Sequence, residues 1–156
     1  AGYFAINSLR MEKGYRHWGH DIGEEDNPVE AGLGFTVAWN KPEGFLGRDA
    51  LLKAKAVGKP RRRMVQIRLE GGHSAPLLHH NEPILLDGRM IGSVTTGAFG
   101  HRIGASLALG MIRSEDGVDA AFLASGRFEV EIACERFPAE LRLGAWYDPK
   151  QARVRV

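Results

Sequence analysis

The chain has 156 residues, of which 44% are hydrophobic and 26% charged, with a net charge of +2 and a sequence pI near 8.9. These values predict a globular protein of one domain or slightly more, and the positive charge is too weak to indicate nucleic-acid binding. No apolar run approaches the length that crosses a membrane, and no signal peptide is visible. We therefore expect neither nucleic acid nor a membrane as a partner.

The first part of the chain predicts a mixture of helices and strand. A helix is expected over residues 3–13, with Ile6 and Leu9 on a short apolar stripe and Gly14 placed to end it. Over residues 33–39 apolar side chains alternate with small ones, which is typical of a strand. A second helix is predicted over residues 48–57, and the Gly-Lys-Pro segment at 58–60 ends it.

After residue 60 the pattern changes to sheet. Short alternating runs occur at residues 65–69, 84–86, 90–94, 107–111, 128–132 and 141–143. Asp87-Gly88 is a hairpin signal, and the Gly-rich segment 97–104 is interpreted as a barrel loop. The prediction is a mainly β protein: an antiparallel, Greek-key-like β-barrel over residues 62–156, preceded by the α+β tail of another domain over residues 1–58.

Few side chains suggest chemistry by their spacing. The single cysteine, Cys134, is expected to be a buried small side chain, and one cysteine fits a reducing compartment such as the cytoplasm. The six histidines lack the spacing of a metal site, so no metal is expected. No nucleophile elbow, phosphate loop or dinucleotide fingerprint is visible, and no catalytic residue is assigned.

Glu12 has two interpretations. It lies near the end of the first predicted helix beside Arg10 and Lys13, so it could be a surface residue paired with a neighbouring cation. Alternatively it faces a pocket, where one carboxylate accepts two parallel hydrogen bonds from a flat N–C–N edge such as that of a pterin. Periodicity alone does not decide between them.

Five segments, in order, resemble the glycine-cleavage T-protein family. They read SLRMEKGYRHWGHDI from residue 8, PVEAGLGF from 28, FLGRDAL from 45, NEPILLDGRMIGSVTTG from 81 and SLALGMI from 106. The YRHWG part of the first segment most resembles the flavin-fused members, the sarcosine and dimethylglycine dehydrogenases. The match touches nearly the whole chain.

The resemblance implies a set of functional expectations. Glu12 matches the residue that grips the pterin of tetrahydrofolate in this family. Lys41 falls by residue count where a basic residue, often Arg, contacts folate in some members, and Tyr15 and Trp18 could line the site. The family's catalytic Asp lies upstream of the matching region. We therefore expect a fragment that alone has no amine dehydrogenase activity and binds no flavin.

In the intact parent, FAD would occupy the missing N-terminal part and oxidise a small N-methyl amine, and tetrahydrofolate would take up the one-carbon unit. The expected location is the cytoplasm, or the mitochondrial matrix in a eukaryote. Three alternatives stay open. They are a free-standing aminomethyltransferase that uses a lipoyl carrier protein, a non-catalytic regulatory subunit of a phosphatase, and an RNA-binding barrel. The RNA-binding barrel would need aromatic residues with basic neighbours on one strand face, and these are not found.

Overall fold

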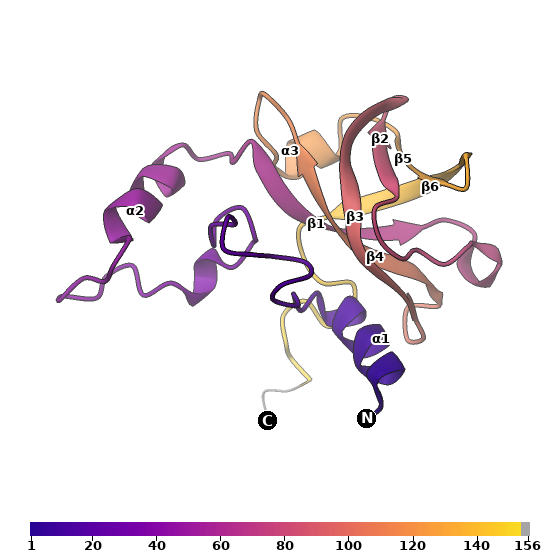
Figure 1. The fold of residues 1–156 in the computed structure, drawn as a ribbon, viewed down its shortest axis with the longest axis horizontal. Coiled ribbons are helices and arrows are strands. Elements are labelled where there is room, and N and C mark those ends of the chain that lie inside the picture. Colours follow the sequence, from indigo (N-terminus) through magenta and orange to yellow (C-terminus); the bar gives the residue numbers. More distant parts are fainter. Residues whose placement is uncertain (154–156) are drawn as a thin grey trace.

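The computed structural model describes residues 1–153, in which six antiparallel strands close into a barrel after a helical segment (Figure 1). The strands are β1 (Arg62–Leu69), β2 (Pro83–Leu86), β3 (Arg89–Gly100), β4 (Ala105–Arg113), β5 (Phe128–Ile132) and β6 (Glu135–Arg142). Their order is β1-β4-β3-β2-β5-β6, and β6 pairs with β1 to close the barrel. Because β2, β3 and β4 are consecutive neighbours and β1 lies beside β4, the arrangement is Greek-key-like. The predicted fold class is confirmed.

Two tight hairpin turns join strands of the barrel. Asp87 and Gly88 connect β2 to β3 with φ values of 48° and 80°, the positive values that a two-residue turn of this kind needs, so the predicted hairpin is confirmed. Ala133 and Cys134 connect β5 to β6 with φ values of 50° and 66°. Cys134 is exposed in this turn. The prediction of a buried cysteine is therefore wrong, because the residue follows the strand and is not part of it.

Strand β3 extends well beyond the predicted run of residues 90–94. It continues to Gly100, so the expected Gly-rich loop is reduced to residues 101–104. Gly97 belongs to the strand because the backbone of Leu78 crosses it: a Cβ at this position would lie 2.1 Å from the Leu78 carbonyl oxygen. Glycine here permits close packing of two backbones and does not mark a loop.

The first helix, α1 (Tyr3–Lys13), forms as predicted and packs against β3 and β4 (Figure 1). It ends at Gly14, whose φ of 66° is the left-handed conformation expected after a helix. The predicted Ile6 and Leu9 stripe is wrong as a core-facing surface, since both residues are exposed. Met11 and Glu12 are the buried residues of the helix.

The predicted strand over residues 33–39 is also wrong. A short 3-10 helix, η1 (Gly34–Thr36), lies there, stabilised by local hydrogen bonds such as Thr36 N–H to the Leu33 carbonyl. The barrel pairs its strands with one another, so this segment finds no partner strand, and Phe35 is 79% exposed. The second helix, α2 (Arg48–Ala56), forms close to its predicted bounds, and Figure 1 shows it extending away from the barrel.

Two groups of buried side chains hold the barrel together. The larger fills its interior and includes Ile67, Ile84 and Ile112, all fully buried. The smaller joins Met11 of α1 to Leu107 and Leu109 of β4, so it attaches α1 to the outside of the barrel. Two short helical turns complete the described elements, η2 (Gly72–Ser74) and α3 (Ala120–Leu123). Within residues 1–153, no helix combines the length and the hydropathy needed to span a bilayer.

Candidate functional site

Glu12 is held in place at the end of α1 by contacts from two distant segments. Its side chain is buried, with 3% of the residue exposed. Oε1 accepts hydrogen bonds from the backbone N–H groups of Arg102, at 2.5 Å, and Ile103, at 3.3 Å, in the β3–β4 turn. The Glu12 carbonyl accepts another from Tyr147 N–H at 3.0 Å. The carboxylate is therefore fixed in orientation, because its partners are backbone groups.

The surface-pair interpretation of Glu12 is wrong. Arg10 forms its ion pair with Asp21, at 2.6 Å, and Lys13 forms one with Asp148, at 3.5 Å. The two cations beside Glu12 in the sequence thus point to other carboxylates. Glu12 instead receives neutral backbone donors, and its charge is not cancelled by an ion pair within the described residues.

Glu12 borders a hollow of about 570 Å³ between α1 and the β3–β4 turn. Phe4 and Leu9 form one apolar wall of the hollow. Their side chains are free to contact a ligand, because Phe4 is 93% exposed and Leu9 is 57% exposed. The other wall carries His101 and Arg102 from the turn. An open hollow with an apolar wall and a fixed carboxylate suits a flat ring that has hydrogen-bond donors along one edge.

The other predicted folate contacts lie elsewhere. Tyr15 is 54% exposed and borders a separate hollow together with Leu33 and Phe35. Lys41 is exposed in the turn after η1 and lines neither this hollow nor the one beside Glu12. The structure therefore does not bring Glu12, Tyr15 and Lys41 together around one hollow within residues 1–153.

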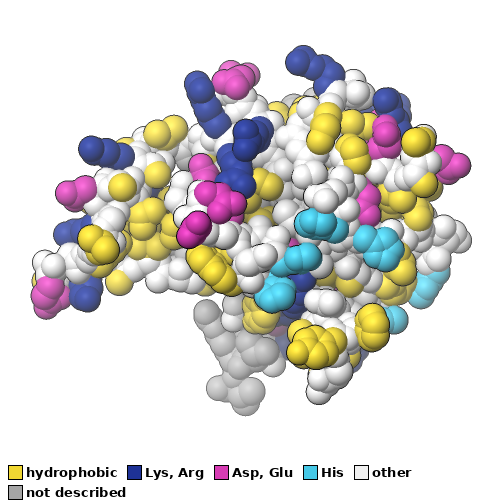
Figure 2. All heavy atoms as spheres, in the orientation of Figure 1, with side chains coloured by type: hydrophobic (Ala, Val, Ile, Leu, Met, Phe, Trp, Pro, Cys, Tyr) yellow, Lys and Arg dark blue, Asp and Glu magenta, His cyan; other side chains and the backbone are white. Residues whose placement is uncertain are grey.

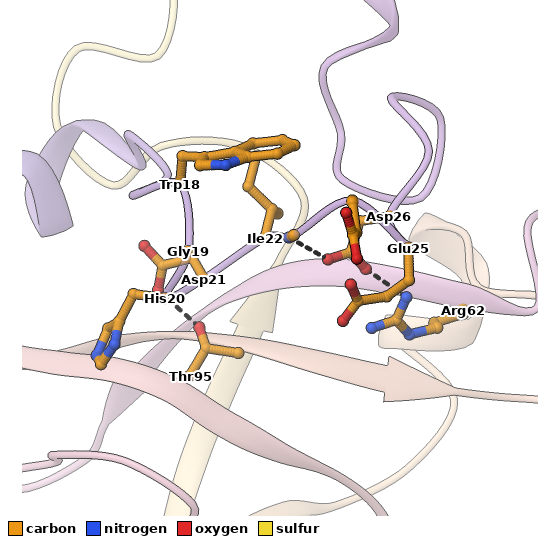
Figure 3. A pocket seen from close by; sticks show the side chains of 11 residues that line it. Trp18, Gly19, His20, Asp21, Ile22, Glu25, Asp26, Arg62 and Thr95 are labelled. Carbon is orange, nitrogen blue, oxygen red and sulfur yellow. Dashed lines mark hydrogen bonds and ion pairs between the residues drawn. The ribbon is translucent and has the colours of Figure 1, made fainter. Parts of the chain in front are cut away.

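A third hollow, shown in Figure 3, is bordered by Trp18 and by the acidic segment that follows it. Trp18 is 67% exposed, while Asp26 on the opposite side is bound to Arg62 of β1. Asp21 lies at its base and hydrogen bonds to Thr95. The sequence interpretation did not single out Asp21, although it stands in the family-like segment after YRHWG.

Asp21 joins three parts of the chain. Its Oδ2 accepts hydrogen bonds from Arg10 Nη1, at 2.6 Å, and from His17 N–H, at 2.7 Å. Its Oδ1 accepts from Thr95 Oγ1, at 2.8 Å, and from Thr96 Oγ1, at 2.6 Å. Both oxygens are thus occupied by donors, and α1, the loop after it and β3 are tied to one carboxylate.

The pKa of Asp21 is lowered from its ordinary value. Burial is the largest single influence and opposes ionisation, but the hydrogen bonds from Thr96, His17 and Thr95 and the charge of Arg10 together outweigh it. Asp21 is therefore ionised at neutral pH and serves as a structural anion with its acceptor positions already used.

Three histidines lie in a row beside Asp21. The ring centroids of His17 and His20 are 5.9 Å apart, and those of His20 and His80 are 5.0 Å apart and stacked. His80 Nδ1 is also 2.5 Å from the Thr95 carbonyl oxygen. In the part of the chain that the structure describes, no group of three His, Cys, Asp or Glu residues has the arrangement of a metal site.

Comparison with known proteins identifies the family. A model of the glycine cleavage T-protein C-terminal barrel domain matches residues 62–148, and one of the GCVT N-terminal domain matches residues 1–41. The chain belongs to the glycine cleavage T-protein family. The resemblance stated from the sequence is thereby confirmed.

The relatives of this T-protein family chain are much longer proteins. The 4-methylaminobutanoate oxidase (formaldehyde-forming) of Paenarthrobacter nicotinovorans is 43% identical over 155 residues, which cover 99% of this chain and 18% of that protein. Human mitochondrial sarcosine dehydrogenase is 39% identical over 157 residues, which cover 99% of this chain and 17% of that protein. The chain thus spans less than a fifth of the length of these two homologous oxidoreductases.

A solved structure gives the same fold. The crystal structure of glycine cleavage system aminomethyltransferase T from Bartonella henselae superposes with a TM-score of 0.72 at 25% identity. The match covers 88% of this chain and 37% of that chain. The chain therefore corresponds to the end of the family's N-terminal domain followed by its C-terminal barrel.

Proposed function

We propose that this chain is the tetrahydrofolate-binding portion of an FAD-dependent amine oxidoreductase, which passes a one-carbon unit to tetrahydrofolate. The support from the comparisons is chemical. The names of the two oxidoreductases above describe oxidation of an N-methyl amine, and one of them adds that formaldehyde is formed. Folate that traps this unit would keep the reactive product from escaping.

The proposal divides the work between parts of a longer protein. Residues 1–58 would complete the folate-binding domain, and residues 62–156 would form the barrel domain behind it. FAD and the N-methyl amine would bind in the remainder of that protein, in the cytoplasm or, in a eukaryote, in the mitochondrial matrix. This chain alone would bind no flavin and oxidise no amine.

The observation that carries the proposal is the setting of Glu12. Its carboxylate is buried, fixed by the amides of Arg102 and Ile103, and unpaired with any cation in the described range. An ionised carboxylate has roughly four acceptor positions, and Oε1 uses its share for the two turn amides, so the free positions are on Oε2. The 2-amino group and N3–H of a pterin are two neighbouring donors on one edge of the ring, which suits this free oxygen.

The walls of the hollow support the same ligand. A pterin ring has two apolar faces, and the exposed side chains of Phe4 and Leu9 offer a surface for one of them. His101 and Arg102 add polar groups at the opposite wall. We infer that Glu12 sets the orientation of the ring while the apolar wall supplies contact area.

Lys41 and Tyr15 stay predicted folate contacts, but with parts of folate other than the pterin ring. Neither lines the hollow beside Glu12, so neither would contact the pterin ring that Glu12 holds. Lys41 would instead attract the carboxylates of the glutamate tail of folate. Its ammonium group is a point charge and orients a carboxylate less strictly than the planar guanidinium of an Arg would. Tyr15 would pack against the aromatic middle of the folate.

Calorimetric titration of tetrahydrofolate into the longer parent protein tests the role of Glu12. Glu12→Gln keeps one oxygen for the turn amides but places an amide donor opposite a pterin donor. The loss of that hydrogen bond should weaken the free energy of folate binding by roughly 1.5–3 kcal/mol. We expect about ten- to a hundredfold weaker binding than for the wild type. Glu135→Gln, a change at an exposed glutamate in the β5–β6 hairpin, serves as the matched control and should bind as the wild type does. Equal affinities for all three proteins would remove Glu12 from the site.

The superposition with the Bartonella henselae protein supports a second candidate, a glycine-cleavage aminomethyltransferase. That enzyme would take its one-carbon unit from a lipoyl carrier protein and would need no flavin. The two candidates differ in a simple observation on the longer protein. A flavin absorbance that sarcosine bleaches supports the oxidoreductase, whereas one-carbon transfer that depends on an added lipoyl carrier supports the aminomethyltransferase.

A further inference from the structure

A second hollow, of about 880 Å³, opens at one end of the barrel and is lined by arginines from three strands. We name it the arginine hollow and define it by Arg61, Arg62, Arg89 and Arg113 with the apolar residues Leu86 and Phe122. Figure 2 shows Lys and Arg side chains along the upper edge of the molecule, above the barrel end that carries α3 and the start of β1 in Figure 1. None of the residues predicted to contact folate lines it.

The positive charge of the arginine hollow is only partly neutralised. Arg62 and Arg113 are directly opposite each other on β1 and β4, and like charges in that position repel. Arg62 is neutralised by Asp26, but Arg89 and Arg113 form no ion pair within residues 1–153. A bound anion would neutralise Arg89 and Arg113.

The acidic side chain that lines the hollow does little to cancel its charge. Glu115 contacts Arg61 at 3.2 Å, with side chains that are 90% and 73% exposed. An ion pair so exposed is weak and readily exchanged for another partner. Three arginine positions thus remain accessible to an external carboxylate, because guanidinium groups bind carboxylates through two parallel hydrogen bonds.

The floor of the hollow is apolar. Leu86, Ile91 and Phe122 are partly buried and pack against the barrel core, and they turn their remaining surface toward the hollow. Met90, at its edge, is 64% exposed. Arginine, methionine and aromatic residues are enriched in protein-binding surfaces.

The arginine hollow lies far from the Glu12 hollow. Strand β3 begins at Arg89 and ends at Gly100, two residues before Arg102, whose amide binds Glu12. At about 3.3 Å per residue, the path along this 12-residue strand is on the order of 36 Å long. One folate molecule bound at Glu12 would not fill both hollows, so a ligand of the arginine hollow would be a separate molecule.

We propose that the arginine hollow docks an acidic segment of a partner protein that also carries apolar side chains. Carboxylates of the segment bind Arg89 and Arg113, and its apolar side chains cover Leu86, Ile91 and Phe122. A small inorganic anion fits the hollow less well for two reasons. It would leave the apolar floor exposed, and it binds best to hydrogen-bond donors in an enclosed site, whereas Arg89 and Arg113 are exposed. The exposed positions of Arg89 and Arg113 suit a segment laid across the surface.

Fluorescence anisotropy with the 156-residue chain tests the proposal. The probe is a fluorescein-labelled synthetic peptide made of Glu, Asp, Leu and Phe, and a second peptide has Ser in place of Leu and Phe. We expect the double variant Arg89→Gln with Arg113→Gln to bind the first peptide about five- to thirtyfold more weakly than the wild type. The control, Lys53→Gln with Lys150→Gln, removes the same charge from two exposed lysines elsewhere and should bind as the wild type does.

Two further measurements separate this partner from other anions. Met90→Glu places a repelling carboxylate at the edge of the hollow without disturbing the core, and it should weaken binding of the acidic peptide. The Ser-containing peptide should bind about tenfold more weakly, because it lacks apolar side chains for the floor. Circular dichroism checks that each variant keeps the barrel.

Four outcomes would overturn the proposal. The first is no binding of the acidic peptide, and the second is an equal loss in the control double variant. The third is equal binding of the two peptides with displacement by inorganic tripolyphosphate, which indicates a small-anion site. The fourth is that the arginine double variant binds phosphatidylserine vesicles more weakly than the wild type does but binds the peptide equally well, which indicates a lipid surface.

Discussion

Thr96 of β3 donates a hydrogen bond of 2.6 Å to the carboxylate of Asp21, which lies 75 residues earlier in the chain. Thr95, its neighbour in the strand, donates a second one to the same oxygen. Adjacent residues of a strand normally face opposite sides, but the register of β3 against β4 shifts between Val94 and Thr96. This bulge turns both hydroxyls toward Asp21.

We predict that Asp21→Asn destabilises the chain by about 3 kcal/mol in free energy of unfolding. The change leaves the buried Arg10 guanidinium without its anion and sets an amide donor against donors from the chain. Urea denaturation measures the effect. The control, Asp116→Asn, changes an exposed carboxylate and should have little effect. Equal stabilities of the two variants would show that Asp21 does not hold the loop to the barrel.

The lowered pKa of Asp21 predicts a pH dependence of stability. Because the folded-state pKa lies below the ordinary value of 3.8, the stabilisation is fully present above that pH and is lost as pH falls through the folded pKa. Urea denaturation at several pH values should show a smaller loss of stability on acidification for Asp21→Asn than for the wild type. Asp21→Asn should still lose some stability on acidification, because other carboxylates also have lowered pKa values. One of them is Asp119, whose pKa is lowered by the hydrogen bond from Lys59. Parallel pH profiles for the two proteins would contradict this assignment.

Gly97→Ala should destabilise the barrel by about 2 kcal/mol, because the new methyl group would collide with the backbone of Leu78. Gly144→Ala is the matched control, since a Cβ at Gly144 would meet nothing within 4 Å. Thermal unfolding of both variants measures the difference. A Gly97→Ala protein as stable as the control would mean that the Leu78 segment moves aside freely.

Much of the barrel could be predicted from local sequence. The alternation over residues 65–69 and 128–132 and the Asp87-Gly88 turn depend on side-chain period and turn conformation, which are local properties. The same alternation over residues 33–39 predicts a strand, but the segment contains a 3-10 helix. A strand also needs a neighbouring strand to pair with, and alternation does not reveal one. The exposure of Cys134 depended on where β5 ends, which alternation alone does not define.

The candidate site could be predicted only in part. Glu12 was selected by its position in a family-like segment, but its partners, the amides of Arg102 and Ile103, lie about 90 residues later and carry no side-chain signal. Asp21 was missed for a similar reason. Its role depends on a bulge that brings two adjacent threonines to one side, and no periodicity in the sequence marks that bulge.

The amides of Arg102 and Ile103 report directly on the central claim, since both donate to the carboxylate that would hold the pterin. The measurement is a titration of tetrahydrofolate into the ¹⁵N-labelled 156-residue chain, followed by two-dimensional NMR, which detects even weak binding. The account predicts that these two signals shift with increasing folate in the wild type and in Glu135→Gln, and that they shift much less in Glu12→Gln. Signals of Arg102 and Ile103 that stay in place while other amides respond to folate, or that shift equally in Glu12→Gln, would contradict the assignment of Glu12 to the pterin.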